Sequence, residues 1–535
     1  MDFVSRKQFR SIIVVLIFQL GLVFLIHGSV TGNDQPDIRQ AVLPSETQSG
    51  LANCRFGAAT MADDQVNWMD DLGAGWYFSF TESMPPAPNL AEYVPLISIR
   101  QNKSNGVYLP SFSVNPPMTD YRLGQLVDDR PGSLWVLGNE VDRGPNPGQT
   151  QGGQGDTFPE IYAEGYHEVY NFIKERDPNA QIAVSALVQV TPGRLQYLDI
   201  MWDTYQSIYG AEMPVDVWNL HLYVLPEVNL AGLPNGIANI ALGTDPALGR
   251  RESGGVAALC PLVNVYCVAE HDDLDVFTEQ IVAMRSWMKD HGQQEKPLIL
   301  SEFSILYPYD VNNGNCSVKD EYGNCFTPQR VTNFLNSTFN YLYNAVDPNL
   351  GYSKDGDRLI QQSLWFSIDN EYGVGSVSSL VKNNALTQPG QAFVSYVQGL
   401  SNQINLFQDG VNNPVVDTGG GSTATARLTV DIRNNGNAAP SSNFFVTFYK
   451  DAELSQPIGT ATIIGPGSNN GGMTGCARMM RIASVNWSNL SPGVHQFWVK
   501  IDSTNNVVET IESDNYGTGT VIVNGEQVYL PVALD

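Results

Sequence analysis

The stretch SLWVLGNEVD, residues Ser133 to Asp142, is an apolar run that ends in an amide and a carboxylate. A short run of this composition predicts a strand that is covered on both faces. A carboxylate at the end of such a strand costs free energy unless it lies at the mouth of the fold, where it meets water or a ligand. Taken alone, Glu140 is most simply a solvated acid, so a functional interpretation needs a second strand of the same kind.

The second strand is KPLILSEF, which is again apolar and ends in Glu302 close to Phe303. Between about residues 50 and 400, eight apolar runs alternate with segments of helical period. That count predicts a (β/α)8 TIM barrel, and the carboxyl ends of its strands would bring Glu140 on strand 4 and Glu302 on strand 7 to one rim. The alternative, a doubly wound sheet, usually carries a phosphate loop, and no GxGxxG or Walker pattern follows a strand here. The expected strands are 54–60, 73–80, 93–100, 133–140, 181–189, 215–223, 296–305 and 359–368.

Beyond residue 405 the pattern changes to alternation with period two, as in LTVDIRNNGNAAPSSNFFVTFYKD, with turn residues between the alternating segments. This pattern is typical of an all-β sandwich of the immunoglobulin-like kind. We therefore expect two folded domains, a (β/α)8 domain at 50–401 and a β-sandwich at 407–535.

Composition limits the partners of the chain. Of its 535 residues, 42% are hydrophobic and 16% are charged, which is typical of a folded protein, and its length calls for more than one domain. The formal net charge is −26, so nucleic acid and anionic lipid would be repelled. Neutral substrates such as sugars remain possible.

The N-terminus predicts export. Basic residues at Arg6, Lys7 and Arg10 precede an apolar segment at 12–26, a pattern typical of a secretory signal peptide within residues 1–32. The alternative is an uncleaved anchor, which would be the only membrane contact. Either interpretation places the rest of the chain outside the cell, as a secreted or cell-surface protein.

Six cysteines agree with an oxidising compartment. Cys260 and Cys267 are close in sequence, as are Cys316 and Cys325, and each pair could close a small loop. Cys54 and Cys476 could either pair across domains or stay free. No CxxC occurs and no histidine stands at zinc-ligand spacing beside a cysteine, so we expect no metal and no cofactor.

Two acids that face each other across a cleft suit the cleavage of a glycosidic bond, because one must donate a proton while the other is ionised. The motifs GWYFSF, LGNEVD and LILSEFSI resemble those of the clan A retaining glycoside hydrolases, the 4/7 barrels, and are most similar to the β-glucanase-type cores of family 128. The resemblance implies that Glu140 is the general acid/base, Glu302 the nucleophile, and Asn139 a ligand of the sugar 2-hydroxyl. Where the clan usually has proline after Asn-Glu, this chain has Val141.

The same resemblance suggests further substrate-binding residues. His221 and Tyr223 end strand 6, where the clan often contacts the nucleophile or the sugar; the alternative for His221 is a rim histidine bonded to a backbone carbonyl. Trp365 on strand 8 would stack on a sugar, or else belong to the barrel core. Trp76 near strand 2 is a weaker candidate. Arg100 at the end of strand 3 would orient the nucleophile, or form a structural ion pair.

The C-terminal segment resembles CARDB-type modules through LTVDIRNNGNAAPSSNFFVTFYKD and VKIDSTNNVVETIESDNY. Such a domain would act in adhesion or carbohydrate binding, or serve as a spacer, and we favour the spacer. Four acids in its turns could bind calcium, although turn acids are more often solvated. They are Asp502, Glu509, Glu512 and Asp514.

These observations predict an exported retaining O-glycoside hydrolase that cleaves a neutral polysaccharide or oligosaccharide, with a β-glucan-type substrate favoured, by double displacement. The alternative is a non-catalytic cell-surface protein that uses the same barrel for glycan binding or adhesion. A metal-dependent barrel hydrolase is a third possibility, and the sequence lacks the histidine cluster that it needs.

Overall fold

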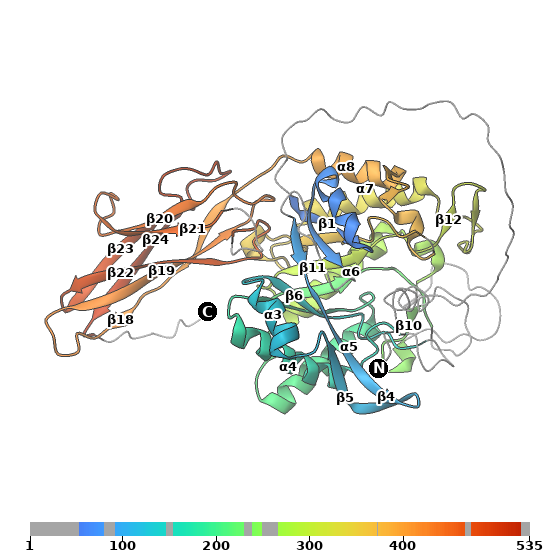
Figure 1. Cartoon of the computed structure of the whole chain (residues 1–535), viewed down its shortest axis with the longest axis horizontal. Helices are drawn as coiled ribbons and strands as arrows, with labels where there is room; N and C mark the ends of the chain where they lie inside the picture. The colour runs from blue at the N-terminus through green and yellow to red at the C-terminus, as the bar shows by residue number, and fades with distance from the viewer. Residues whose placement is uncertain are drawn as a thin grey trace.

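The computed structural model describes residues 53–79, 91–145, 153–228, 238–248, 266–371, 373–465 and 472–525. Within them an N-terminal α/β unit is followed by an all-β unit, which extends to one side of it (Figure 1). The expected signal segment, residues 1–32, lies outside the described residues. No helix among the described residues has both the length and the apolar character to cross a bilayer.

All eight expected strands of the α/β unit occur, and the third is divided at Pro95. Two sheets have the orders β3-β2-β1-β14-β11-β8 and β5-β4-β6-β7, and their neighbours are parallel except that β5 forms an antiparallel hairpin with β4. A parallel bridge from Ala183 to Val217 connects β7 with the segment before β8. The strands are β1 (Asn53–Thr60), β2 (Ala74–Ser79), β3 (Glu92–Val94), β4 (Leu96–Ser104), β5 (Val107–Asn115), β6 (Leu134–Asn139), β7 (Gln181–Ala186), β8 (Trp218–His221), β11 (Leu298–Phe303) and β14 (Gln362–Trp365).

Helices follow most of these strands and cover the sheets (Figure 1). Four of the five long helices begin with a proline in the first turn, where its missing N–H costs nothing. The threonine before α7 and the one before α8 cap these helices by accepting a backbone N–H. The helices are α2 (Met69–Leu72), α3 (Gln125–Asp128), α4 (Pro159–Arg176), α5 (Pro192–Tyr209), α6 (Leu274–Asp290), α7 (Pro328–Asn344) and α8 (Gln388–Gln398).

Short elements occupy the connections of the α/β unit. The helical ones are η1 (Asp63–Trp68), η2 (Asp120–Gly124), η3 (Pro246–Leu248), η4 (Val268–Glu270), η5 (Ser353–Asp355) and η6 (Ser376–Ser378). The strand pairs are β9 (Glu227–Val228) with β10 (Ala238–Asn239), β12 (Tyr309–Asp310) with β13 (Asn315–Cys316), and β15 (Val381–Lys382) with β16 (Ala385–Leu386).

The apolar composition of the parallel strands has the expected cause. Every residue of β1, β2 and β11 is buried, because these strands have side chains packed against both faces. An acid within such a strand can only be accommodated at its end, and this is where Glu302 lies.

The all-β unit is a two-sheet sandwich, with sheet orders β17-β19-β22 and β18-β24-β23-β20-β21. Side chains in β19 alternate between buried and less buried positions, and the inner faces meet in a core that includes Leu428, Phe448 and Phe497. The strands are β17 (Leu406–Val411), β18 (Val415–Val416), β19 (Ala424–Asn434), β20 (Phe444–Tyr449), β21 (Pro457–Ile463), β22 (Arg481–Leu490), β23 (Gly493–Lys500) and β24 (Tyr516–Val523).

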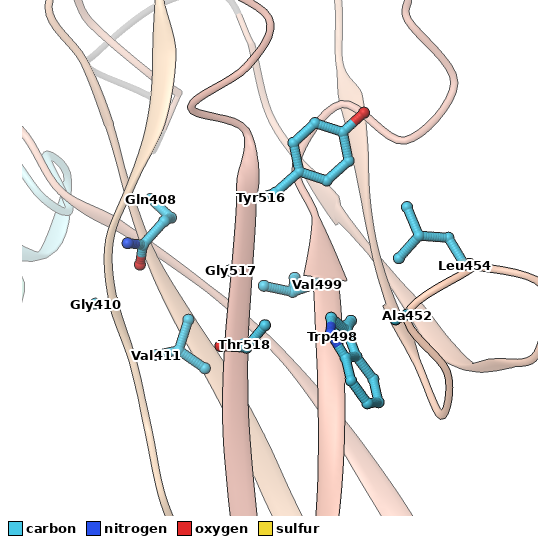
Figure 2. Close-up of a pocket in the computed structure, with 10 residues that line it drawn as sticks. All are labelled: Gln408, Gly410, Val411, Ala452, Leu454, Trp498, Val499, Tyr516, Gly517 and Thr518. Atoms are coloured by element: carbon cyan, nitrogen blue, oxygen red, sulfur yellow. The ribbon is translucent and has the colours of Figure 1, made fainter.

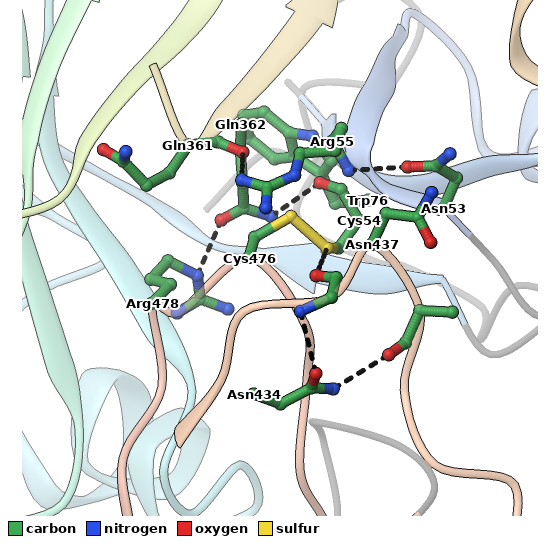
Figure 3. The surroundings of a disulfide bond; sticks show 12 residues. Asn53, Cys54, Arg55, Trp76, Gln361, Gln362, Asn434, Asn437, Cys476 and Arg478 are labelled. Carbon is green, nitrogen blue, oxygen red and sulfur yellow. Dashed lines mark hydrogen bonds between the residues drawn. A yellow bond between two sulfur atoms is a disulfide. The ribbon is translucent and has the colours of Figure 1, made fainter. Parts of the chain in front are cut away.

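A disulfide between Cys54 and Cys476 joins the two units, with 6.2 Å between the Cα atoms (Figure 3). Beside it, the buried guanidinium of Arg478 donates to Gln362 Oε1 over 2.7 Å and also bonds the side chains of Glu92 and Gln181. These partners are the first residues of β14, β3 and β7, and Cys54 is the second residue of β1. The sandwich is therefore fixed to the amino ends of the parallel strands.

The remaining cysteines agree in part with the expected loop closures. Cys316 and Cys325 form a disulfide with 5.8 Å between their Cα atoms. Cys267 is disulfide-bonded, and Cys260 lies outside the described residues. The described cysteines include none that is free.

Candidate active site

The two predicted acids meet at the carboxyl ends of their strands. Glu140 directly follows β6, and Glu302 is the fifth residue of β11. One carboxylate oxygen of each, together with a ring nitrogen of His221, lie within 4.8 Å of one another. Both acids are buried, at 4% and 8% exposure. The fold thus brings together two carboxyl groups that are far apart in the sequence.

His221 and Tyr223 contact this pair directly. The Nδ1 atom of His221 lies 3.2 Å from Glu140 Oε1 and 3.7 Å from Glu302 Oε2. The Tyr223 hydroxyl donates a hydrogen bond of 3.0 Å to Glu302 Oε2. His221 therefore lies between the two carboxylates. The alternative prediction, a rim histidine bonded to a backbone carbonyl, does not describe this arrangement.

The backbone at Glu140 has an unusual conformation. Its φ angle is +44°, in the left-handed region that costs a residue with a side chain about 1–3 kcal/mol. Hydrogen bonds hold it there: its N–H donates to Ala186 over 2.9 Å, and its carbonyl accepts the N–H groups of Arg143 and Gly155, each over 3.0 Å. A conformation fixed in this way directs the carboxyl group toward His221.

Arg143 was not predicted from the sequence, although it lies three residues after Glu140 in NEVDR. Its guanidinium lies 3.5 Å from Glu140 Oε2. Behind it, the fully buried Arg194 forms ion pairs with Asp142 and, over 2.6 Å, with Glu227. These cations stabilise negative charge at Glu140 from the protein side.

The different environments of Glu140 and Glu302 shift their pKa values in opposite directions. Burial raises the pKa of Glu302 to about 7, opposed by the charge of His221 and reinforced by that of Glu140. Burial also acts to raise the pKa of Glu140, but the hydrogen bond from His221 and the charge of Arg143 outweigh it, and the pKa is lowered. Burial lowers the pKa of His221, yet both carboxylates together raise it above its ordinary value. In the free site Glu140 is the ionised acid, and Glu302 holds a proton more readily.

The same three side chains could hold a metal ion. Glu140, His221 and Glu302 offer two oxygens and one nitrogen close enough for a shared cation, and mixed histidine and carboxylate sets bind zinc in catalytic sites. The sequence predicts no metal, because it contains no CxxC and no histidine at zinc-ligand spacing beside a cysteine. A ligand set with one histidine and two carboxylates from the ends of three different strands leaves no local motif in the sequence.

Trp365 does not have the predicted position for sugar stacking. It is fully buried, its indole N–H donates to the Ser378 carbonyl over 2.7 Å, and its ring packs against Phe303 and Phe339. This prediction is corrected, because the side chain faces the helix layer. The next residue, Phe366, instead places its ring near Tyr223, with centroids 6.5 Å apart.

Trp76 and Arg100 also lie away from the acids. Trp76 is fully buried and donates to the Ser363 carbonyl over 3.2 Å, near the Cys54 disulfide at the amino ends of the strands (Figure 3). Arg100 is exposed and donates to the backbone carbonyl of Gln154, because β4 continues into a hairpin beyond the strand end. Within the described part of the chain, neither side chain hydrogen-bonds or pairs with Glu140 or Glu302.

Asn139 ends β6 directly before Glu140, is paired with Ala186 and is half-buried.

The loops at this end are held by a residue that sequence reasoning missed. His271 donates from Nδ1 to the Val224 carbonyl over 2.9 Å and accepts the Leu306 N–H at Nε2 over 3.0 Å. It thereby joins the segments that follow β8 and β11, and burial lowers its pKa to about 4.

The acids named as calcium candidates in the sandwich accept hydrogen bonds from other residues of the sandwich. Asp502 accepts the N–H groups of Asn506 and Val507, and Glu509 accepts that of Leu406 over 2.5 Å. Asp514 accepts the side-chain amide of Asn405 over 2.9 Å. Among the described residues, the potential metal-binding group is the one at Glu140.

Comparison with solved structures finds glycoside hydrolases and CARDB domains. A family 128 (subgroup II) endo-β-1,3-glucanase from Sorangium cellulosum is 16% identical over 64% of this chain and 98% of its own, with a TM-score of 0.35. An endo-β-1,4-mannanase from Thermotoga petrophila is 10% identical over 89% and 99%, with a TM-score of 0.31. The CARDB domain of a Pyrococcus furiosus protein, solved with two metal ions, is 20% identical over 23% and 92%, with a TM-score of 0.16.

At these identities and TM-scores the likenesses carry no argument about activity. No curated protein matches the chain. The family models give a match for the C-terminal segment, in agreement with the resemblance of its strand and turn motifs. Residues 411–519 match the CARDB model, and this part of the chain is a CARDB domain.

Proposed function

We propose that the chain is an exported retaining O-glycoside hydrolase with a (β/α)8 catalytic domain at 50–401 and a CARDB accessory domain at 407–535. The order of parallel neighbours supports the barrel. Starting from β1 it runs through β2, the divided third strand (β3 and β4), β6, β7, β8, β11 and β14, and β14 pairs with β1. The bridge from Ala183 to Val217 supplies the contact between β7 and β8. The disulfides favour an oxidising compartment, as export requires.

The observation that carries the proposal is the convergence of Glu140 and Glu302 in one buried site. Retaining enzymes hold their two carboxyl groups about 5–5.5 Å apart, so that one can attack the anomeric carbon directly. Inverting enzymes need a wider gap for a water molecule. Oxygens within 4.8 Å of each other favour the retaining chemistry.

In the proposed reaction, Glu302 attacks the anomeric carbon while Glu140 donates a proton to the departing glycosidic oxygen. Water then attacks the glycosyl–Glu302 ester as Glu140 takes up its proton, which restores both groups. Tyr223 supports Glu302 through its hydrogen bond of 3.0 Å. Asn139 would bond the sugar 2-hydroxyl.

These roles require a proton on Glu140 when substrate is bound, whereas the free site favours a proton on Glu302. His221 contacts both oxygens through Nδ1, at 3.2 and 3.7 Å. We assign to it the transfer of that proton from one carboxyl group to the other. The ring of Phe366 lies near that of Tyr223, with centroids 6.5 Å apart, and we assign Phe366 to the wall of the proposed site.

The substrate is proposed to be a neutral polysaccharide or oligosaccharide of β-glucan type. The acidic chain, with net charge −26, would repel a polyanionic polymer. The test is a panel of β-glucans, xylans and mannans, assayed for released reducing ends with the wild type, Glu140→Gln and Glu302→Gln. Glu175→Gln, an exposed acid of α4, is the matched control.

The expected result is turnover of at least one β-glucan, loss of about 10³-fold or more in each site variant, and full activity in the control. A 2-deoxy-2-fluoro glycoside should attach covalently to Glu302, which peptide mass spectrometry identifies. Attachment to Glu140 would reverse the two roles. Equal turnover in the wild type and both site variants would refute the hydrolase proposal.

The potential ligand set at Glu140 favours one alternative, a metal-dependent hydrolase. In that case a chelator should abolish turnover and added zinc should restore it. We expect activity that a chelator leaves unchanged, because the proposed reaction uses only the two carboxyl groups and water.

A further inference from the structure

A surface hollow of about 520 Å³ lies in the CARDB domain, where β17, the β20–β21 turn and strands β23 and β24 meet (Figure 2). This volume is in the range of sites that hold small molecules. None of its ten lining residues is charged. They are Gln408, Gly410, Val411, Ala452, Leu454, Trp498, Val499, Tyr516, Gly517 and Thr518.

Two aromatic rings stand on neighbouring strands of this hollow. Trp498 on β23 is paired with Thr518, and Tyr516 on β24 is paired with Lys500. Because side chains alternate along a strand, all four lie on the outer face, while Phe497 belongs to the core. Tyr516 is 47% exposed and Trp498 is half-buried, so both offer ring surface to a ligand.

The hollow also contains a polar atom without a partner. The side-chain Oε1 of Gln408 is buried and accepts no hydrogen bond within the described part of the chain. A buried acceptor left in this state costs about 1–3 kcal/mol, and a ligand in the hollow can donate to it once the Gln408 side chain turns Oε1 toward the hollow. In Figure 2 Gln408 lies across β24 from the two rings, and Thr518 carries a hydroxyl between them.

We propose that this hollow is a binding site for a neutral oligosaccharide segment. Aromatic faces bury the C–H faces of pyranose rings, and an amide and a hydroxyl bond sugar hydroxyl groups. None of the lining residues carries a charge that would pair with an ionic ligand. The neighbouring Lys500 ammonium lies 5.8 Å from the centroid of the Tyr516 ring, and the net charge of −26 repels anions. The domain therefore has a ligand of its own and is more than the spacer that its sequence suggested.

This site is separate from the carboxylates. The disulfide and Arg478 fix the CARDB domain to the amino ends of the parallel strands, whereas Glu140 and Glu302 lie at the carboxyl ends. The hollow therefore does not extend the catalytic site along the same sugar chain. The proposed sugar-binding site does not depend on the proposed hydrolysis, so it would hold for a chain that is not an enzyme.

The experiment is affinity electrophoresis of the full chain, with Glu302→Gln as the parent so that polymers are not cleaved. The gels contain laminarin, hydroxyethylcellulose, xylan or galactomannan. The test variants are Trp498→Ala, Tyr516→Ala and Gln408→Leu. Tyr121→Ala is the matched control, because Tyr121 is 92% exposed and lies on η2 of the α/β unit.

We expect at least one polymer to retard the parent, and each ring deletion to weaken that binding about tenfold. Trp498→Phe should restore part of the affinity, and Tyr121→Ala should leave it unchanged. Thermal unfolding identifies a variant that fails to fold, in which case Tyr516→Ala, at a more exposed position, decides. No retardation by any of the polymers, or equal retardation of the parent and the ring variants, overturns the proposal. Retardation that depends on the rings in a chain without hydrolytic activity would support this site and refute only the catalytic proposal.

Discussion

Replacing Glu302 by glutamine should stabilise the protein at alkaline pH while it abolishes the proposed hydrolytic activity. Burial gives this acid a pKa of about 7 in the folded chain, against an ordinary value of 4.5. The folded state thus binds the proton more tightly than the unfolded state. The stability contributed by the protonated form is fully present below pH 4.5 and is lost as the pH rises through 7.

The magnitude follows from the difference between the two pKa values, which is about 2.5 units at 1.36 kcal/mol each, or about 3 kcal/mol. The amide introduced by Glu302→Gln would carry no charge at any pH and would still accept the hydrogen bond from Tyr223. At pH 8 the variant should therefore exceed the wild type in free energy of unfolding by about 3 kcal/mol, and at pH 4 the two should be nearly equal.

The assay is urea unfolding at pH 4 and pH 8, followed by circular dichroism, with Glu175→Gln as the surface control. Glu140→Gln provides the contrast. The pKa of Glu140 is lowered in the folded chain, so removal of its charge should destabilise the protein at pH 8. A Glu302→Gln variant that is no more stable than the wild type at pH 8 would refute the assignment of the burial cost to this acid.

Three further changes test the site and the contact between the two units. Tyr223→Phe removes a bond that lowers the pKa of Glu302, so the limb of the pH–rate profile that belongs to this acid should move up by about one unit. Arg478→Ala leaves its carboxylate partner buried without a counter-ion and should cost about 3–5 kcal/mol in urea unfolding, whereas an unchanged midpoint would contradict the buried ion pair. The double change Cys54→Ser and Cys476→Ser should lower stability by about 2–4 kcal/mol in calorimetry, and an unaltered transition temperature would show that this cross-link contributes nothing.

The strands of the α/β unit were predictable because full burial leaves a continuous apolar run, as in LWVLG before Asn139 and LIL before Ser301. The meeting of Glu140 and Glu302 followed from one topological rule, that the carboxyl ends of parallel strands lie at one edge. The CARDB sandwich was predictable from its period-two alternation, which the family match supports.

The positions of the remaining site residues depend on side-chain orientation and tertiary contacts, which the sequence does not show. In LWFS, Trp365 and Phe366 are equally plausible ligands, and only the orientation of each side chain places the first in the core and the second near Tyr223. The sequence predicted Arg100 at the end of the third strand, but β4 continues past this residue into a hairpin with β5. His271 bonds Val224 and Leu306, which are remote in sequence and which no local spacing indicates. Arg143 lies only three residues from its partner Glu140, but the sequence does not show that the turn between them brings the two side chains together.

The bond between Cys54 and Cys476 also sets an order for the biogenesis of the protein. Ribosomes deliver the first strand of the α/β unit hundreds of residues before the partner cysteine, which lies 422 positions later. Until that late segment has been synthesised, Cys54 cannot form this bond. The chain consequently reaches its mature covalent form only after almost all of it has been synthesised, and truncated products lack the cross-link.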